Sequence, residues 1–205
     1  MRYLITQSLI GSWNYLFNCR EECQNDALAE FNETLNRVPK LTTPEMQDGI
    51  DFENEVYKIV RGEPRTPHPK WEHGINAVAT RLNGAQLQVK AYRECQVGGL
   101  TLLVHGVFDA LRAGVIFDVK KTSKGFGSAD LAGKYLGSPQ HPTYLFLEPS
   151  AYKFVYLVSD GEDLYPEEYP RGQTRDFPEL ASEFLTSIES MGLLETYKEK
   201  WRAKE

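Results

Sequence analysis

Residues 105–122 read HGVFDALRAGVIFDVKKT, two β-rich runs on either side of a short turn. Because side chains alternate between the two faces of a strand, Asp118 and Lys120 project together, while Phe117 and Val119 point to the opposite face. A hairpin brings Asp109 of the first run alongside them. In so apolar a strand, an acid and a lysine on one face must be solvated, paired with each other or bound to a metal. Taken alone, the Asp-x-Lys pattern is most simply a salt bridge beside a turn.

Around this hairpin, apolar spacing predicts helices before and after a small sheet. A Thr-Thr-Pro sequence at residues 42–44 and the pair Ser138-Pro139 are typical helix starts, and Gly98-Gly99 separates two of three strands of an antiparallel meander. The first predicted helix lies within residues 4–17 and begins near Thr6 or Ser8, either of which could cap it. The other predicted helices cover 26–38, 42–62, 138–146 and 177–201, and the predicted strands cover 87–97, 100–110, 114–119 and 152–158. We therefore expect the α/β class, or an α+β variant, with a mixed sheet between helices.

The composition limits the classes of protein that this chain could be. A length of 205 residues predicts one domain over residues 1–205, and 41% hydrophobic with 25% charged residues is an ordinary globular balance. Apolar stretches fall far short of the roughly 20 residues that a membrane-spanning helix needs, and the amino-terminal segment lacks the apolar centre of a secretory signal. Three cysteines, Cys19, Cys23 and Cys95, cannot form a closed disulfide framework, so we interpret them as structural thiols of a protein in the cytoplasm.

Charge is distributed unevenly along the chain. The formal net charge is −6, which by itself argues against a nucleic-acid partner, yet residues 1–55, 56–135 and 136–205 carry −6, +6 and −6. A basic middle segment is compatible with a local groove for a polyanion, and equally with charges scattered over a solvated surface. Charge alone therefore permits a nucleic-acid partner without requiring one.

Four short motifs occur in an order that resembles the PD-(D/E)XK nuclease superfamily, and most closely its RecB-type and phage exonuclease branch. They are Gly49-x-x-x-Glu53, Gly106-Val107-Phe108-Asp109, Asp118-Val119-Lys120-Lys121-Thr122 and Gln140-x-x-x-Tyr144, and Thr6-Gln7-Ser8 is a looser match to the helix that opens the family's domain. Each motif alone is weak, whereas four in order, each on the expected type of element, are fairly specific. The resemblance covers residues 49–144 and implies a restriction-endonuclease-like mixed β-sheet flanked by helices.

The resemblance also implies a set of site residues. Glu53, Asp109 and Asp118 are hard oxygen ligands suited to one or two Mg²⁺ or Mn²⁺ ions, and the Val119 carbonyl is a further ligand by analogy. Lys120 is expected to position or help deprotonate the attacking water, completing a catalytic set with the three acids. The residues expected to bind substrate are Gln140 and Tyr144, by analogy, and Lys121 and Lys124 of the following Lys-rich stretch, as phosphate contacts.

Several of these assignments have simpler alternatives. Glu53 is preferred to Asp51 and Glu55 only because of its spacing from Gly49, and Tyr144 sits among apolar residues that could belong to the core. A structural role is the simpler interpretation of His105, although it precedes the second motif. Relatives that hold an iron–sulfur cluster carry three cysteines late in the chain, where this sequence has none, so no cluster is expected.

The sequence thus predicts a metal-dependent DNA nuclease, with small size favouring a stand-alone exonuclease of recombination, repair or phage DNA processing. The alternatives are a catalytically silent DNA-binding or assembly module with the nuclease fold, and a structural interaction protein. The complete set of Glu53, Asp109, Asp118 and Lys120 favours the nuclease, because a silent module needs no such set. The expected partners are DNA, a recombination or single-strand annealing protein, and further copies of the chain, but no membrane. A cytoplasmic protein of bacterial or phage origin fits these expectations.

Overall fold

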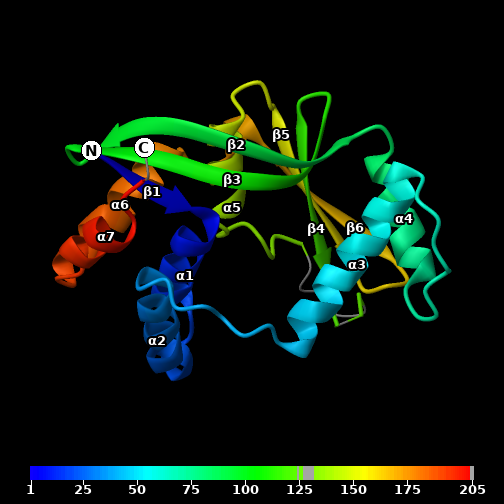
Figure 1. Cartoon of the computed structure of the whole chain (residues 1–205), viewed down its shortest axis with the longest axis horizontal. Coiled ribbons are helices and arrows are strands. Elements are labelled where there is room, and N and C mark those ends of the chain that lie inside the picture. Colours follow the sequence, from blue (N-terminus) through cyan, green and yellow to red (C-terminus); the bar gives the residue numbers. More distant parts are fainter. Residues whose placement is uncertain (124, 127–131, 204–205) are drawn as a thin grey trace.

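A six-stranded mixed sheet lies at the centre of the molecule, with helices packed on both sides (Figure 1). This computed structural model describes residues 1–123, 125–126 and 132–203. In chain order, the elements are β1 (Arg2–Thr6), α1 (Gln7–Asn18), α2 (Gln24–Leu35), α3 (Pro44–Arg61), α4 (Glu72–Leu82), β2 (Gln86–Val97), β3 (Leu100–Arg112), β4 (Val115–Lys121), α5 (Gln140–Leu147), β5 (Lys153–Ser159), β6 (Leu164–Pro170), α6 (Phe177–Ser190) and α7 (Leu194–Lys200), with short 3-10 turns at Glu21–Cys23 and Arg171–Gln173.

The strands follow the order β1-β3-β4-β5-β6, and β2 pairs with β3 as well. Strand β3 is antiparallel to β2 along most of its length and parallel to β1 up to the pair Thr6 and His105. It pairs with β4 only next to the turn, from Ala110 to Arg112, and the two strands are separated before Ala110 on β3 and after Phe117 on β4. Strand β4 then runs parallel to β5, and β6 forms the antiparallel edge. This mixed sheet between helices confirms the predicted α/β, restriction-endonuclease-like fold class.

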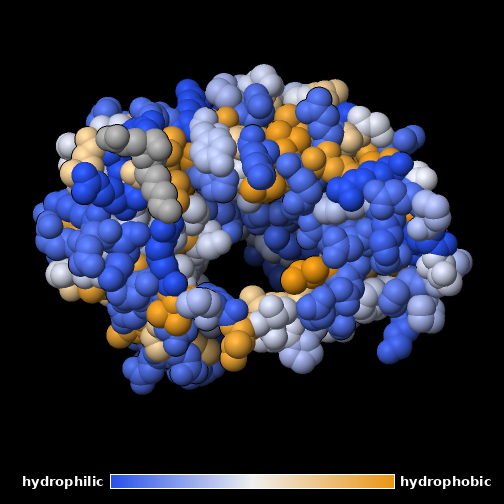
Figure 2. All heavy atoms as spheres, viewed as in Figure 1, coloured by the Kyte–Doolittle hydropathy of each residue, from blue (hydrophilic) through white to orange (hydrophobic). Residues whose placement is uncertain are grey.

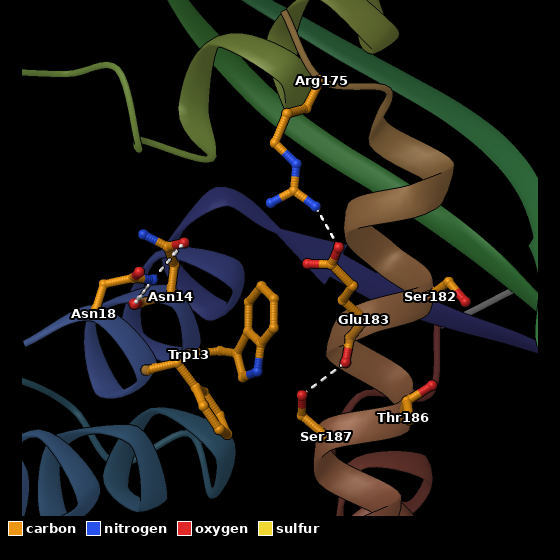
Figure 3. Close-up of a pocket in the computed structure, with 9 residues that line it drawn as sticks. Trp13, Asn14, Asn18, Arg175, Ser182, Glu183, Thr186 and Ser187 are labelled. Atoms are coloured by element: carbon orange, nitrogen blue, oxygen red, sulfur yellow. Dashed lines mark hydrogen bonds and ion pairs between the residues drawn. The ribbon is translucent and has the colours of Figure 1, made fainter. Parts of the chain in front are cut away.

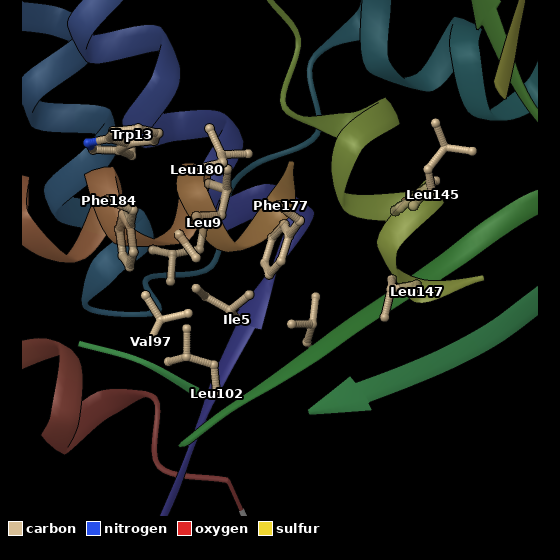
Figure 4. Packing of buried hydrophobic residues seen from close by; sticks show 14 of the residues in the cluster. Ile5, Leu9, Trp13, Val97, Leu102, Leu145, Leu147, Phe177, Leu180 and Phe184 are labelled. Atoms are coloured by element: carbon tan, nitrogen blue, oxygen red, sulfur yellow. The ribbon is translucent and has the colours of Figure 1, made fainter. Parts of the chain in front are cut away.

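Two hydrophobic cores hold the helices to the sheet. The larger lies between the sheet and helices α1, α2, α5, α6 and α7, and Figure 4 shows Leu9 of α1 and Phe184 of α6 packed over Ile5 and Leu102. The smaller lies under α3 and α4, where Phe52 and other apolar side chains cover β4 and β5. Figure 2, which has the same view as Figure 1, shows an opening between the side of the molecule that carries α1 and α2 and the side that carries α3. The two cores thus anchor two groups of helices around one sheet.

Local signals explain the helix ends that the sequence predicted. Thr6 caps α1 by accepting a hydrogen bond from the Leu9 amide, and Thr43 caps α3 in the same way, with Pro44 in its first turn. Helix α3 ends at Gly62, which has the left-handed φ of 69°. The predicted meander is confirmed as β2, β3 and β4, and the predicted strand at 152–158 as β5.

Other elements differ from the prediction. The first helix begins at Gln7 after the Thr6 cap, as predicted, but the residues before it form β1, which was not predicted because its pairing with β3 outweighs the local helical spacing. The predicted helix 177–201 is two helices, interrupted near Gly192, whose φ is 71°. Helix α4 and strand β6 were not predicted, since α4 follows a proline-rich loop and has a glycine in its first turn, and β6 contains prolines, which are tolerated mainly in edge strands.

Two further observations concern the chain as a whole. None of the helices among the described residues has the length and apolar character needed to cross a membrane. Cys19, Cys23 and Cys95 are free and only partly exposed.

Candidate active site

The candidate site lies where β3 and β4 separate, a place that we call the fork and define by Asp109 and Asp118. Three residue pairs join the two strands next to the turn, and the pair farthest from the turn is Ala110 with Phe117. Asp109 and Asp118 are the next residues along each strand, where the pairing has stopped. Instead of a backbone carbonyl, the Asp109 Oδ2 accepts the hydrogen bond from the Val119 amide, at 2.8 Å. The fork is therefore held open by a side chain that replaces one bond of the β-ladder.

Asp118 is the most deeply buried acid of the fork, with 3% of its surface exposed. Its Oδ1 accepts a hydrogen bond from the Gln140 Nε2 at 2.5 Å, and its Oδ2 lies 2.7 Å from the Lys120 Nζ. About a third of the Lys120 side chain, 34%, is exposed. Burial by itself would lower the pKa of Lys120, but the carboxylates of Asp118 and Asp109 raise it above its ordinary value. Lys120 is therefore a protonated donor at neutral pH.

Glu53 reaches the fork from α3 and is fixed by two residues that sequence reasoning missed. Its Oε1 accepts hydrogen bonds from the Tyr57 hydroxyl and, at 3.1 Å, from the Gln88 Nε2. The Gln88 Nε2 lies 2.8 Å from the Tyr57 hydroxyl oxygen as well, which ties the three side chains together. Tyr57 could have been found from its spacing, because residues four apart on a helix are neighbours.

Gln88 left no comparable signal in the sequence. It lies on β2 between Leu87 and Val89, which pair with Ala110 and Phe108, and so it faces Asp109 across the ladder. Its φ of 53° is in the left-handed region, which is unusual for a residue with a side chain. This conformation, together with its place beside the fork, marks Gln88 as part of the site.

The three acids of the fork influence one another electrostatically. Burial raises the pKa of Glu53, and the charge of Asp118 adds to the increase. Burial also raises the pKa of Asp109 well above its usual range, with further contributions from Asp118 and Glu53. Among the described residues, however, no three His, Cys, Asp or Glu side chains are already grouped as a metal site. The carboxylates are close enough to repel one another, and each is held by its own hydrogen bonds.

Helix α5 brings Gln140 to the fork, whereas Tyr144 lies deeper. Tyr144 is 7% exposed, and its ring centre lies 5.0 Å from that of Phe108. A Cβ on Gly106 would lie 2.8 Å from the Tyr144 ring, so glycine allows this close approach. Burial raises the pKa of Tyr144 to about 12. Tyr144 is thus packed into the larger core behind the acids.

Lys121, one of the two lysines expected to contact phosphate, is not part of this cluster. The Lys121 Nζ donates hydrogen bonds to the carbonyls of Thr122 and Asp160, at 2.7 and 2.8 Å. It also lies 5.3 Å from the centre of a Trp71 ring, towards α4. Lys124 lies outside the described residues. His105 does not contact the acids, but stacks on Tyr92.

A separate cavity of about 490 Å³ lies between α1 and α6, away from the fork (Figure 3). Trp13 forms one wall, and the ion pair of Arg175 and Glu183 lies at its edge. None of the fork residues lines this cavity.

Comparisons with known proteins give a similarity of fold. No known family matches the sequence, and a comparison with curated proteins finds no match either. Among solved structures, the protein SSO0001 is 17% identical over 92% of this chain and 76% of its own, with a TM-score of 0.54. Rai1 of Scheffersomyces stipitis is 13% identical over 90% of this chain and 61% of its own, with a TM-score of 0.40. The similarity to SSO0001 shows a shared fold, in agreement with the restriction-endonuclease-like α/β fold described above.

Proposed function

We propose that this chain is a divalent-metal-dependent nuclease that hydrolyses phosphodiester bonds in DNA, and that it acts as an exonuclease in recombination, repair or phage DNA processing. One observation carries the proposal: Glu53, Asp109, Asp118 and Lys120 come from three different elements and gather at the fork. Two of these acids have raised pKa values because the cluster is buried and negatively charged. Perturbed pKa values of this kind are frequent at functional sites.

The donor set fits a hard divalent cation. Glu53, Asp109, Asp118 and the Val119 carbonyl offer the oxygen ligands that Mg²⁺ and Mn²⁺ prefer, for one or two ions. A bound ion would neutralise charge at the scissile phosphate and lower the pKa of a bound water. It would also remove the repulsion that now raises the pKa values of Glu53 and Asp109. Small side-chain shifts are required, because the described residues contain no group already arranged as a metal site.

The chain's own residues supply orientation and positive charge. We assign Lys120, which lies 2.7 Å from Asp118, to position or help deprotonate the attacking water and to stabilise charge that develops on the phosphate. Gln140 fixes the orientation of Asp118, and Gln88 fixes that of Glu53. We keep Lys121 and Lys124 as proposed phosphate contacts, whereas we assign Tyr144 to support the acids from the larger core rather than to contact the substrate.

Degradation of linear and closed-circular DNA with Mg²⁺ or Mn²⁺ tests this function. We expect loss of linear DNA alone, abolished by Lys120→Ala, by Asp118→Asn and by a chelator. The control is Lys153→Ala, which removes a lysine from the neighbouring strand β5 that pairs with Glu168 at 2.9 Å, away from the fork.

Other outcomes lead to different conclusions. Cutting of closed circles would make the protein an endonuclease. Cleavage that survives Lys120→Ala and Asp118→Asn would contradict the assignment of the fork. Absence of cleavage of any DNA would favour the silent DNA-binding or assembly module.

A further inference from the structure

One face of the sheet formed by β1, β2 and the first part of β3 is turned away from the larger core. Leu102, Val104 and Phe108 of β3 are fully buried in that core with helices α1 and α6. Because side chains alternate, His105 points to the opposite face. Its partner across the ladder is Tyr92 of β2, whose surface is 60% exposed. This face therefore presents an aromatic side chain to solvent.

Tyr92 and His105 form a stacked pair. Their ring centres lie 4.4 Å apart with an angle of 24° between the ring planes. His105 supports one side of the Tyr92 ring, which leaves much of the remaining ring surface in water. A ring already held against a second ring loses little conformational freedom when a flat ligand stacks on it. The pair is thus a preorganised stacking surface.

The stacking surface and the fork share strand β3. Along β3, His105 and Asp109 are four residues apart, which corresponds to about 13 Å at roughly 3.3 Å for each residue. Lys90, which is exposed and pairs with Val107, lies between the two positions. A basic side chain therefore separates an aromatic surface from a cluster of acids, within the span of a few nucleotides at roughly 3.4 Å each.

We propose that Tyr92, backed by His105, stacks on an unpaired base of a single-stranded nucleic acid whose backbone runs past Lys90 to the fork. This inference rests on the proposed nuclease function. Every base has a flat π-face, so such stacking selects for single strands without selecting a sequence. A base within a duplex is not free to stack on Tyr92, so the proposal assigns single-stranded DNA, or a frayed end, as the form that enters the site.

Binding of two fluorescent oligomers, measured in EDTA to prevent cleavage, tests the stacking. One is an eight-nucleotide oligothymidylate, and the other has the same backbone with abasic sites in place of bases. Tyr92→Thr removes the ring and keeps a residue that favours strands. The matched control is Tyr152→Thr, since Tyr152 is 59% exposed but lies beside the turn at Gly114.

We expect Tyr92→Thr to weaken binding of oligothymidylate by at least about five-fold, the lower end of base–aromatic stacking, and to leave binding of the abasic oligomer unchanged. Tyr92→Phe and Tyr152→Thr should bind both oligomers as the unaltered protein does. Equal binding by Tyr92→Thr, an equal loss on both oligomers, or no binding by the unaltered protein would each overturn the proposal.

The DNA cleavage assay separates this inference from the proposed function. DNA cleavage without any effect of Tyr92→Thr on binding would contradict the stacking proposal and support the proposed nuclease function. Base-dependent binding through Tyr92 without DNA cleavage would support the stacking proposal and contradict the proposed nuclease function.

Discussion

The two halves of the sheet bury different kinds of side chain. Among the described residues of β1, β2 and β3, no polar side chain belongs to the fully buried set, although Asp109 of β3 is half-buried at the fork. Strands β4, β5 and β6, with helix α5, contribute Asp118, Gln140, His141, Thr143, Ser159 and Glu167. Two more, Ser12 and Thr34, lie on helices α1 and α2. Buried polar groups are unfavourable unless they are hydrogen-bonded, so their concentration around β4, β5 and β6 marks where the sheet accepts a cost in stability.

Strand β4 shows the same contrast within a few residues. Val115 to Phe117 pair with both β3 and β5, whereas Asp118 to Lys121 pair only with β5. Charged side chains begin where the ladder to β3 ends, and the Asp109 carboxylate replaces the missing acceptor for Val119. The end of the pairing between β3 and β4 therefore provides the room in which acids and a lysine can gather.

The largest effect is expected for Asp109→Asn, which should separate activity from stability. The Asn amide oxygen can still accept from the Val119 amide, while a carboxyl whose pKa is raised by burial and by its acidic neighbours is removed. We expect DNA cleavage to fall by more than about 100-fold, because even partners outside the first ligand shell are worth roughly 10- to 100-fold. The free energy of unfolding without metal, from urea titration, should stay equal or rise. Asp163→Asn, at an exposed acid, should change neither quantity.

The second prediction concerns His141, a buried polar residue of α5. Burial lowers its pKa to about 4, whereas an unfolded histidine titrates near about 6.5. The neutral ring therefore stabilises the fold fully above about pH 6.5, and this contribution is lost as the pH falls towards 4. Relative to His141→Phe, the unaltered protein should lose up to about 3 kcal/mol over that range.

Urea unfolding at several pH values between 4 and 7 measures this difference. The matched control is His73→Phe, because the His73 side chain is 76% exposed. An equal pH dependence in the unaltered protein and His141→Phe would show that His141 does not titrate in this way.

A smaller effect should distinguish the buried ion pair of β4 from an exposed one. Lys120→Met leaves the buried Asp118 carboxylate without its counter-charge at 2.7 Å, and we expect a loss of about 2 kcal/mol, less than for a fully buried pair because Lys120 is partly exposed. Lys153→Met breaks a pair with the half-exposed Glu168 and should lose less than about 1 kcal/mol. Urea unfolding at neutral pH compares them, and equal losses would contradict the contrast between the two pairs.

The smallest effect concerns two glycines of α3, the helix that carries Glu53. A Cβ on Gly49 or on Gly62 would meet no atom within 4 Å, but only Gly62 has a left-handed φ, of 69°. Gly49→Ala should therefore raise the free energy of unfolding by up to about 1 kcal/mol, and Gly62→Ala should lower it by a similar amount. Thermal unfolding of both variants tests this, and destabilisation by Gly49→Ala would show that packing requires the glycine.

Local patterns in the sequence predicted the meander and the pairing of Asp118 with Lys120 on one face. They also predicted the start of α3, because Thr43, Pro44 and Gly62 specify its ends without help from the rest of the chain. The choice of Glu53 over Asp51 and Glu55 rested on spacing alone, and the structure brings Glu53 to the fork through Tyr57 and Gln88. Strand β1 and the role of Gln88 depend on contacts between distant segments, and no local pattern encodes such contacts.

Local sequence was therefore enough to predict the α/β class, the hairpin, and the acids and lysine of the candidate site. The alternation of side chains along a strand, helix capping and turn chemistry each depend on only a few neighbouring residues. Only the tertiary structure decided where β3 and β4 separate, that Asp109 holds the fork open and that Lys121 turns towards α4. These features depend on register and on packing between α3, α5 and the sheet. Burial and the distances between charges, which set the pKa values of Glu53 and Asp109, exist only once those elements have come together.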